Sequence, residues 1–202
     1  MNLVEKVKNV LLSPKTEWEK SVSENTTFAS LLTGYVAPLA VLGAIAAFIG
    51  YGFIGYSVLG VKIVGMQLGI ALAISTLLNP ILSYVIVTYV VNMLAPSFQS
   101  ENNLDKSARL VAYSQTAGLV ASLFSIIPAI SFLGIIGLYG LYIAWIGLPI
   151  MKNTPNEKKV TYVVAIIVVA IIANIALSFV LDIVMKTLGL PTLSSAVMGS
   201  MR

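Results

Sequence analysis

The chain has no cysteine and no histidine, and only 10% of its residues carry a charge. The missing residues exclude disulfides, thiolate or imidazole metal sites, and every Ser-His or Cys-His nucleophile pair. The scarcity of charge excludes a soluble domain, whose charged fraction is typically about 25%. We therefore predict that the protein is not an enzyme and that it uses no metal and no cofactor.

Hydrophobic residues take the place of the missing charge. They make up 58% of the chain, and the mean hydropathy is +0.95, which is typical of an integral membrane protein. The net charge of +4 is small, and lysines beside apolar runs set orientation in the membrane rather than bind nucleic acid. We predict the lipid bilayer as the main partner, with membrane proteins, cytoplasmic proteins or a second copy of the chain as further partners and no nucleic acid.

Five apolar runs are long enough to cross a bilayer, which requires about 20 helical residues. They lie at residues 30–51, 63–95, 108–127, 132–151 and 160–188. Four of them are of ordinary length. The second would extend about 50 Å as a helix, beyond a hydrocarbon core of about 30 Å. With Asn79-Pro80 at its centre, it is either one tilted, kinked helix or two short halves that form a hairpin.

The distribution of basic residues favours the single helix. With five spans and a cytoplasmic N-terminus, nine of the twelve Lys and Arg residues are cytoplasmic, and only Lys62, Lys186 and Arg202 are external. With six spans the split is six against six, which is no bias. We predict an all-α, polytopic transmembrane helical bundle of five spans, with an external C-terminus. Its parts are a cytoplasmic segment at 1–29, the bundle at 30–190 and an external tail at 191–202.

The N-terminal segment shows a helical stripe of apolar residues that is too short and too charged to span a membrane. Ser13-Pro14 ends a first helix and begins a second one that contains Trp18. Such amphipathic helices lie at the headgroup boundary, so we predict Val7, Leu11 and Trp18 as interfacial anchors. The alternative is that the same stripe packs on the cytoplasmic ends of the bundle, and the sequence leaves both open.

Polar side chains are rare inside the predicted spans. Asp182 is the only acid there, and we predict that it forms an ion pair with Lys186, one turn away. The amides Asn79, Gln115 and Asn174 are the candidate intramembrane polar sites. An amide in hydrocarbon requires a partner, so these residues either hold helices together or bind a solute.

Small residues recur at three- and four-residue spacing in two of the spans, which lets helix backbones approach closely. The alternative is that glycine is simply common in membrane helices. The predicted helix-packing positions are Gly43, Ala47, Gly134, Gly137, Gly140 and Ala144.

Two stretches resemble prokaryotic members of the Ypt-interacting-protein (Yip) domain family. They are LVEKVKNVLLSPKTEWEK, at residues 3–20, and GLYGLYIAWIGLPIMKNTPNEKKVTYVVAIIVV, at residues 137–169. The resemblance extends over nearly the whole chain. It implies a five-span bundle with a cytoplasmic N-terminal segment, located in the prokaryotic cytoplasmic membrane.

Eukaryotic members of this family act in vesicle traffic and associate with Rab-type GTPases. The Asp-Leu-Tyr-Gly-Pro type motif of that branch is absent here, so GTPase binding is not carried over to this chain. We predict a non-catalytic interaction or membrane-organising protein, that is, a scaffold. The alternative is a small-solute channel or carrier, because a helix interrupted at Asn79-Pro80 is also found in transporters.

Overall fold

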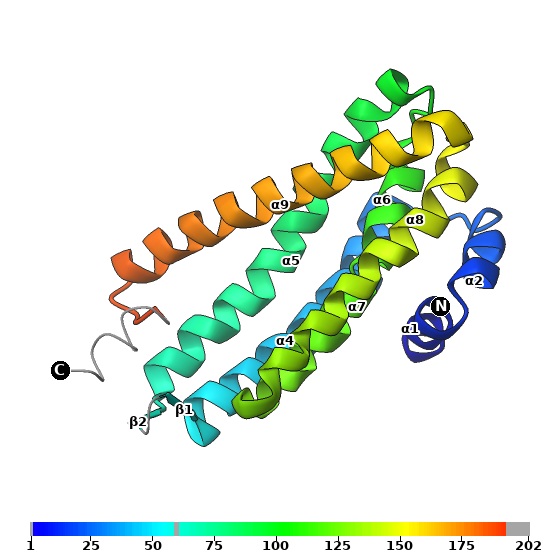
Figure 1. Cartoon of the computed structure of the whole chain (residues 1–202). Helices are drawn as coiled ribbons and strands as arrows, with labels where there is room; N and C mark the ends of the chain where they lie inside the picture. Colours follow the sequence, from blue (N-terminus) through cyan, green and yellow to red (C-terminus); the bar gives the residue numbers. More distant parts are fainter. Residues whose placement is uncertain (1, 59–60, 193–202) are drawn as a thin grey trace.

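Long apolar helices pack side by side over most of the chain (Figure 1). The structure is a computed structural model that describes residues 2–58 and 61–192. Within these residues, four helical stretches are long and apolar enough to cross a membrane. They are Phe28–Ile54, Met66–Phe98, Pro128–Lys152 and Asn156–Thr187. The greater part of the predicted external tail, residues 193–202, lies outside the described residues.

Two short helices precede the bundle, as the sequence predicts. Helix α1 (Leu3–Leu12) begins after Asn2, whose side chain accepts a hydrogen bond from the Glu5 amide. Helix α2 (Pro14–Ser21) begins at a proline, which suits a first helical position because the missing N–H has no partner there. The chain therefore turns at Ser13, and α1 and α2 lie on the flank of the bundle (Figure 1).

The first long stretch is not a uniform α-helix. It consists of α3 (Phe28–Leu31), the π-helical turn η1 (Leu32–Val36), α4 (Ala37–Ile49) and the π-helical turn η2 (Gly50–Ile54). The turn η1 lies just before Pro38, which has no N–H to continue an i to i−4 ladder, and the Ala37 amide bonds instead to the Leu32 carbonyl.

The second run is one helix, so the hairpin alternative is excluded. Helix α5 (Met66–Leu94) continues through Pro80 without interruption and ends in the 3₁₀ turn η3 (Ala95–Phe98). A small β-hairpin of β1 (Tyr56–Val58) and β2 (Val61–Ile63) precedes it, with antiparallel pairing. These strands were not predicted from the sequence.

The third run is broken and differs from an ordinary span. It consists of α6 (Leu104–Ser114), α7 (Thr116–Ala121) and the 3₁₀ segment η4 (Ser122–Ile126), with an interruption at Gln115. None of these pieces is long enough alone to count as a spanning helix. The five-span count therefore stays a prediction.

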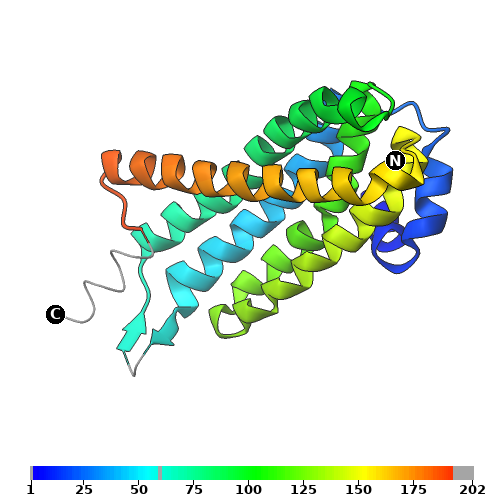
Figure 2. The ribbon, with the colours of Figure 1, turned by 45° about the horizontal axis from the view of Figure 1, so that its top comes forward.

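The fourth run is also irregular in its first half. The 3₁₀ segment η5 (Pro128–Leu138) leads into α8 (Tyr139–Lys152). A turn then connects α8 to α9 (Asn156–Thr187), and these two helices diverge from that turn in both views (Figures 1 and 2). Near the end of α9, Asp182 and Lys186 form the predicted ion pair, with an N–O distance of 2.6 Å.

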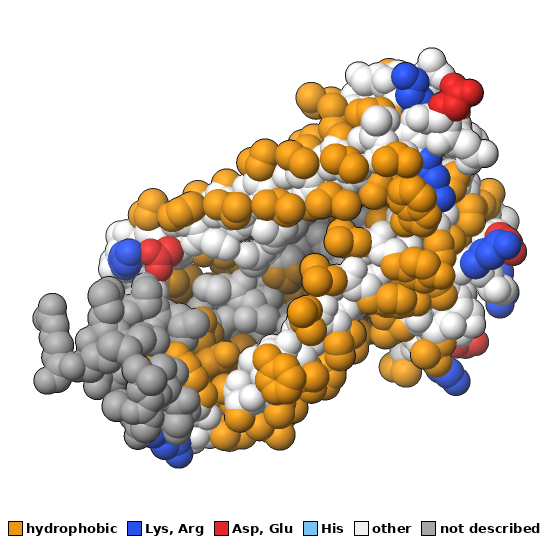
Figure 3. All heavy atoms as spheres, viewed as in Figure 1, with side chains coloured by type: hydrophobic (Ala, Val, Ile, Leu, Met, Phe, Trp, Pro, Cys, Tyr) orange, Lys and Arg blue, Asp and Glu red, His pale blue; other side chains and the backbone are white. Residues whose placement is uncertain are grey.

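The buried core includes Val10 and Trp18 of α1 and α2 and extends across the long helices to Val91 and Tyr162. The largest fully buried aromatic side chains are Trp18, Tyr35, Tyr84, Tyr113 and Tyr162. By contrast, many large apolar side chains on α8 and α9 are exposed, and Figure 3 shows them between charged residues gathered at the ends of the molecule and on the N-terminal flank. This distribution is that of a protein whose solvent, along its middle, is lipid.

Candidate functional site

A cleft of about 580 Å³ lies inside the bundle, between α5, α6, α7, α8 and α9. It occupies the space where α8 and α9 diverge, and Figure 3 shows the surface hollowed between the ridges of these two helices. Sites for small molecules in proteins typically have volumes of about 300 to 1,000 Å³. The cleft is therefore large enough for a ligand, and it is open toward the side of the bundle.

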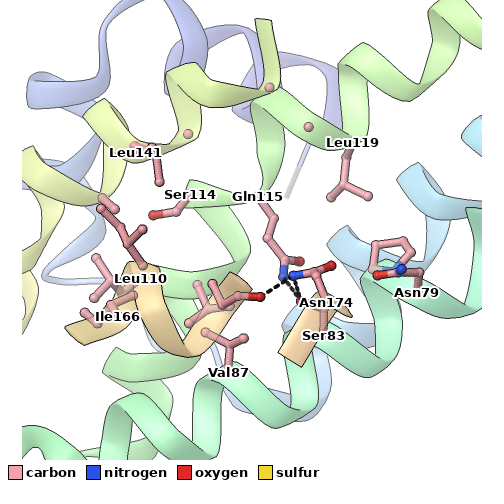
Figure 4. A pocket seen from close by; sticks show the side chains of 18 of the residues that line it. Asn79, Ser83, Val87, Leu110, Ser114, Gln115, Leu119, Leu141, Ile166 and Asn174 are labelled. Atoms are coloured by element: carbon pink, nitrogen blue, oxygen red, sulfur yellow. Dashed lines mark hydrogen bonds between the residues drawn. The ribbon is translucent and has the colours of Figure 1, made fainter. Parts of the chain in front are cut away.

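Two of the predicted intramembrane amides meet in this cleft at a serine (Figure 4). Asn174 Nδ2 lies 3.2 Å from Ser83 Oγ and 2.8 Å from the Ala170 carbonyl oxygen. Gln115 Nε2 donates a longer hydrogen bond of 3.4 Å to the same hydroxyl. These bonds connect α5, α9 and the break between α6 and α7.

Asn79 lines the same cleft but lies apart from this cluster in Figure 4. From the sequence, Asn79 and Asn174 were both expected to need a hydrogen-bond partner inside the membrane. The structure gives Asn174 a partner, Ser83, which the sequence analysis did not single out. Ser83 lies three residues after Pro80 in an apolar helix that contains several other hydroxyl residues, so its position alone did not mark it.

The cleft contains polar atoms that have no partner within the protein. Gln115 Oε1 and Ser114 Oγ are both buried and form no hydrogen bond. Pro80 has no N–H, so the carbonyl of Thr76, a residue that also lines the cleft, lacks its usual helical donor. Most buried polar atoms in folded proteins are paired, so a group of unpaired acceptors indicates a place where something else supplies the donor.

A second cavity, of about 320 Å³, extends from the cleft toward the β-hairpin end of the bundle. It shares Thr76, Gly118 and Ser122 with the cleft, and its wall includes Ser131, whose Oγ is buried and unpaired. All the residues that line the two cavities, within the described part of the chain, are uncharged. The lining of the two cavities therefore suits a neutral molecule, which it can bind by hydrogen bonds and apolar contacts alone.

The predicted helix-packing positions divide into two groups. A side chain at Gly43 would collide with Ser122, and one at Gly140 would collide with the Ser114 carbonyl. Both glycines therefore permit close helix contact. A Cβ at Gly137 would lie 3.2 Å from the Cα of Gly118. Ala47 and Ala144 are buried, at 1% and 9% exposure. Gly134 is exposed, and a Cβ there would meet no atom within 4 Å among the described residues, so no close helix contact within residues 2–58 and 61–192 depends on it.

Trp18 packs on protein, which is the second of the two alternatives that the sequence left open. Its side chain is 2% exposed, and Nε1 donates to the Ile143 carbonyl at 3.0 Å. The indole lies against Gly147, where an added Cβ would overlap the ring. The Tyr113 ring is 5.4 Å away, centroid to centroid. These contacts fix α2 on α8 and leave Trp18 out of reach of lipid headgroups.

Buried charges complete the attachment of the N-terminal helices. Lys6 Nζ lies 2.5 Å from Glu17 Oε1, also pairs with Glu24, and sits over the Tyr113 ring. The side chains of Lys6 and Glu17 are each 6% exposed. Arg109 of α6 donates to the carbonyl of Ser21, the last residue of α2, and to that of Glu24 at 2.6 Å. This network could not be predicted from helical spacing, because Lys6 and Glu17 lie on different helices and Arg109 is 88 residues from Ser21.

The other two predicted anchors are partly buried. Val7 and Leu11 pack against the core, and Tyr139 donates a hydrogen bond of 3.1 Å to the Leu11 carbonyl. The apolar residues of α1 that face outward are different ones: Val4 is 77% exposed and Leu12 is 72% exposed. Val4 and Leu12 are therefore the apolar residues of α1 that are most open to lipid.

Comparison with known proteins gives one match. The model of the Yip1 domain family matches residues 8–178, a range that includes α2, the cleft and most of α9. No curated protein and no solved structure matches the chain.

Proposed function

Since the chain belongs to the Yip1 domain family, we propose that it is a non-catalytic membrane-organising protein whose N-terminal helices form a fixed platform on the cytoplasmic leaflet. The observation that carries this proposal is a buried attachment in two steps: Lys6 joins α1 to α2, and Trp18 and Arg109 join α2 to the bundle. An attached platform keeps one orientation relative to the membrane.

The energetic character of the attachment supports a fixed platform. Burying an ion pair is costly, and removing one partner of such a pair leaves an uncompensated charge, so the pair persists only in one arrangement. Lys6 has Glu17, Glu24 and the Ser21 hydroxyl as partners, all from the segment that it must hold. Rotation of α1 against α2 would break these contacts together, so the outer face of α1 is presented in a constant direction.

That outer face combines apolar and basic residues. Val4, Lys8 and Leu12 recur at four-residue spacing and are all exposed. Such a surface suits the border of an anionic leaflet, where apolar side chains enter the acyl region and a lysine meets a phosphate. We place α1 on the cytoplasmic side because five passes with this orientation put nine of the twelve Lys and Arg residues there. The break at Gln115 would then lie inside the third pass.

A bilayer quenching measurement tests the platform. Because the chain has no cysteine, a single fluorophore can be attached to full-length Leu12→Cys protein in bilayers that contain either anionic or zwitterionic brominated lipid. We expect quenching, and stronger quenching by the anionic lipid at equal mole fraction. Lys8→Gln should remove this preference for anionic lipid. A basic residue near the surface contributes about 1 kcal/mol, which corresponds to about a fivefold change in the ratio of anionic to zwitterionic lipid beside α1.

A matched position serves as the control. Val7→Cys, on the packed side of α1, should be quenched much less than Leu12→Cys. If the Leu12 fluorophore is not quenched by either lipid, the platform does not touch the bilayer and the proposal fails.

The second candidate function is a carrier of a small neutral solute. The two uncharged cavities that share Thr76, Gly118 and Ser122 favour it, because polar groups continue from the Asn174 cluster toward the β-hairpin end. A carrier predicts flux in proteoliposomes that depends on the cleft, whereas the platform function predicts none.

A further inference from the structure

We propose that the intramembrane cleft binds a neutral membrane amphiphile of the long-chain alcohol class, which enters from the bilayer between α8 and α9. This site is separate from the platform of α1 and α2, so it goes beyond the function proposed above. Three observations lead to this class of ligand: the unpaired acceptors, the absence of charge in the lining, and the lateral opening.

The unpaired atoms specify a hydrogen-bond donor. Gln115 Oε1 is an acceptor, and its amide nitrogen is already used on Ser83. The Thr76 carbonyl is an acceptor without its helical donor, because Pro80 has none to give. A ligand hydroxyl would supply the proton that these oxygens lack, and a buried acceptor left unpaired costs about 1 to 3 kcal/mol.

The depth and the neutrality of the cleft exclude a charged headgroup. Along α9, Asn174 lies about 22 Å from Lys159 and about 12 Å from Asp182 at 1.5 Å per residue, so the polar cluster is well inside the hydrocarbon. No lining residue could pair with a phosphate or an ammonium group, since all of them, over the described chain, are uncharged. An alcohol can reach this depth because it carries no charge to desolvate.

The walls suit an alkyl chain. Away from the amides, the cleft is lined by aliphatic side chains of α8 and α9, including Leu141, Ile166 and Ile167. Both ribbon views show α8 and α9 diverging, and Figure 3 shows the hollow between them on the face that meets lipid. A membrane-dissolved molecule can therefore enter without passing through water.

Photolabelling of the full-length protein in lipid nanodiscs tests this proposal. The probe is hexadecanol that carries a diazirine in its chain, and the comparison probe is its methyl ether, which has no hydroxyl proton. We expect the alcohol to label residues that line the cleft, in competition with unlabelled hexadecanol, and the ether to label them several-fold less. Gln115→Leu should lower labelling by the alcohol about five- to tenfold, as expected for one hydrogen bond, and leave the ether unchanged.

Two glycines give a matched pair of variants. A Cβ at Gly118, which lines both cavities, meets no atom within 4 Å, so Gly118→Leu extends into the cleft. Gly34 is equally unobstructed but is not part of the cleft lining. We expect Gly118→Leu to reduce labelling to background and Gly34→Leu to label as the original chain does. If Gly118→Leu does not fold, Ala170→Leu fills the cleft from the α9 side and takes its place.

Three results would overturn the proposal. The first is equal labelling of the original chain and the cleft-filling variant. The second is equal labelling by alcohol and ether together with no effect of Gln115→Leu, which would make the cleft a non-specific lipid crevice. The third is labelling of the lining by a water-soluble diazirine sugar, which would show a wet path and favour the carrier.

Discussion

Gly147 and Trp18 form a contact that can be tested with a double-mutant cycle. Trp18 is 2% exposed and donates a hydrogen bond to the Ile143 carbonyl, so Trp18→Ala should destabilise the docked state of α1 and α2 by about 3 to 5 kcal/mol. This loss should be local, because Trp18 contributes to the attachment of α2 rather than to contacts among the long helices. Each 1.4 kcal/mol changes an equilibrium constant about tenfold, so the rate of hydrogen exchange in α2 should rise by about two to three and a half powers of ten.

Gly147→Ala probes the same contact from the other side. The added methyl group would overlap the indole, and overpacking of this kind costs about 1 to 3 kcal/mol. Alanine also favours a helix over glycine by about 1 kcal/mol, in any background. In the Trp18→Ala background only the second effect remains, so Gly147→Ala should there be neutral or stabilising. The expected coupling energy is the overpacking cost of about 1 to 3 kcal/mol.

Hydrogen exchange in nanodiscs, followed for α2 and for α9 as an internal control, measures each corner of the cycle. We expect protection of α9 to stay unchanged in all three variants. If Gly147→Ala weakens protection of α2 equally with and without Trp18, then the indole contact does not hold the platform, and the reasoning from burial is refuted.

The other predictions concern topology, the midplane amide and the buried charges. In intact cells, the cysteine of Asn102→Cys should be shielded from an impermeant thiol reagent, and the cysteine of Lys62→Cys should react with it. Reaction at position 102 from outside the cell would rule out five passes. Asn174→Leu should lower thermal stability by about 0.6 to 2 kcal/mol and leave any proteoliposome flux unchanged, whereas a stable variant that has lost a measurable flux would favour the carrier. Lys6→Met should destabilise the docked state of α1 by about 3 to 5 kcal/mol, because it leaves the buried Glu17 carboxylate without its partner. Glu17→Gln in the same chain should restore part of that stability, since the unpaired carboxylate is then gone. If the double variant shows no rescue, the ion pair does not hold α1.

Local signals in the sequence predicted local structure well. The turn at Ser13-Pro14 depends on the fixed φ and missing N–H of one residue, and the Asp182–Lys186 pair depends only on helical spacing. The burial of Trp18 could not be predicted in this way. A helical stripe is apolar whether it faces lipid or protein, and the partner that decides between them, Gly147, lies on a distant helix.

The broken third run shows a second limit. Hydropathy reports that a segment is apolar, but it does not report whether the backbone stays helical. The sequence nevertheless carried a signal: Ser114, Gly118 and Ser122 recur every four residues and form a small, polar face that can approach another helix or line a cavity. The structure uses this face for contact with Gly43 and Gly140 and for the cleft.

The interruption at Gln115 also bears on the choice between packing and binding for the intramembrane amides. An amide that only holds helices together should use both its donor and its acceptor within the protein, because an unpaired buried atom is costly. Asn174 meets the donor half of this description, since its nitrogen bonds to Ser83 Oγ and to the Ala170 carbonyl. Gln115 uses its nitrogen on Ser83, but its Oε1 is buried without a partner at the wall of the cleft. Ser83→Ala should therefore act mainly on stability and Gln115→Leu mainly on ligand binding, although both side chains belong to one cluster.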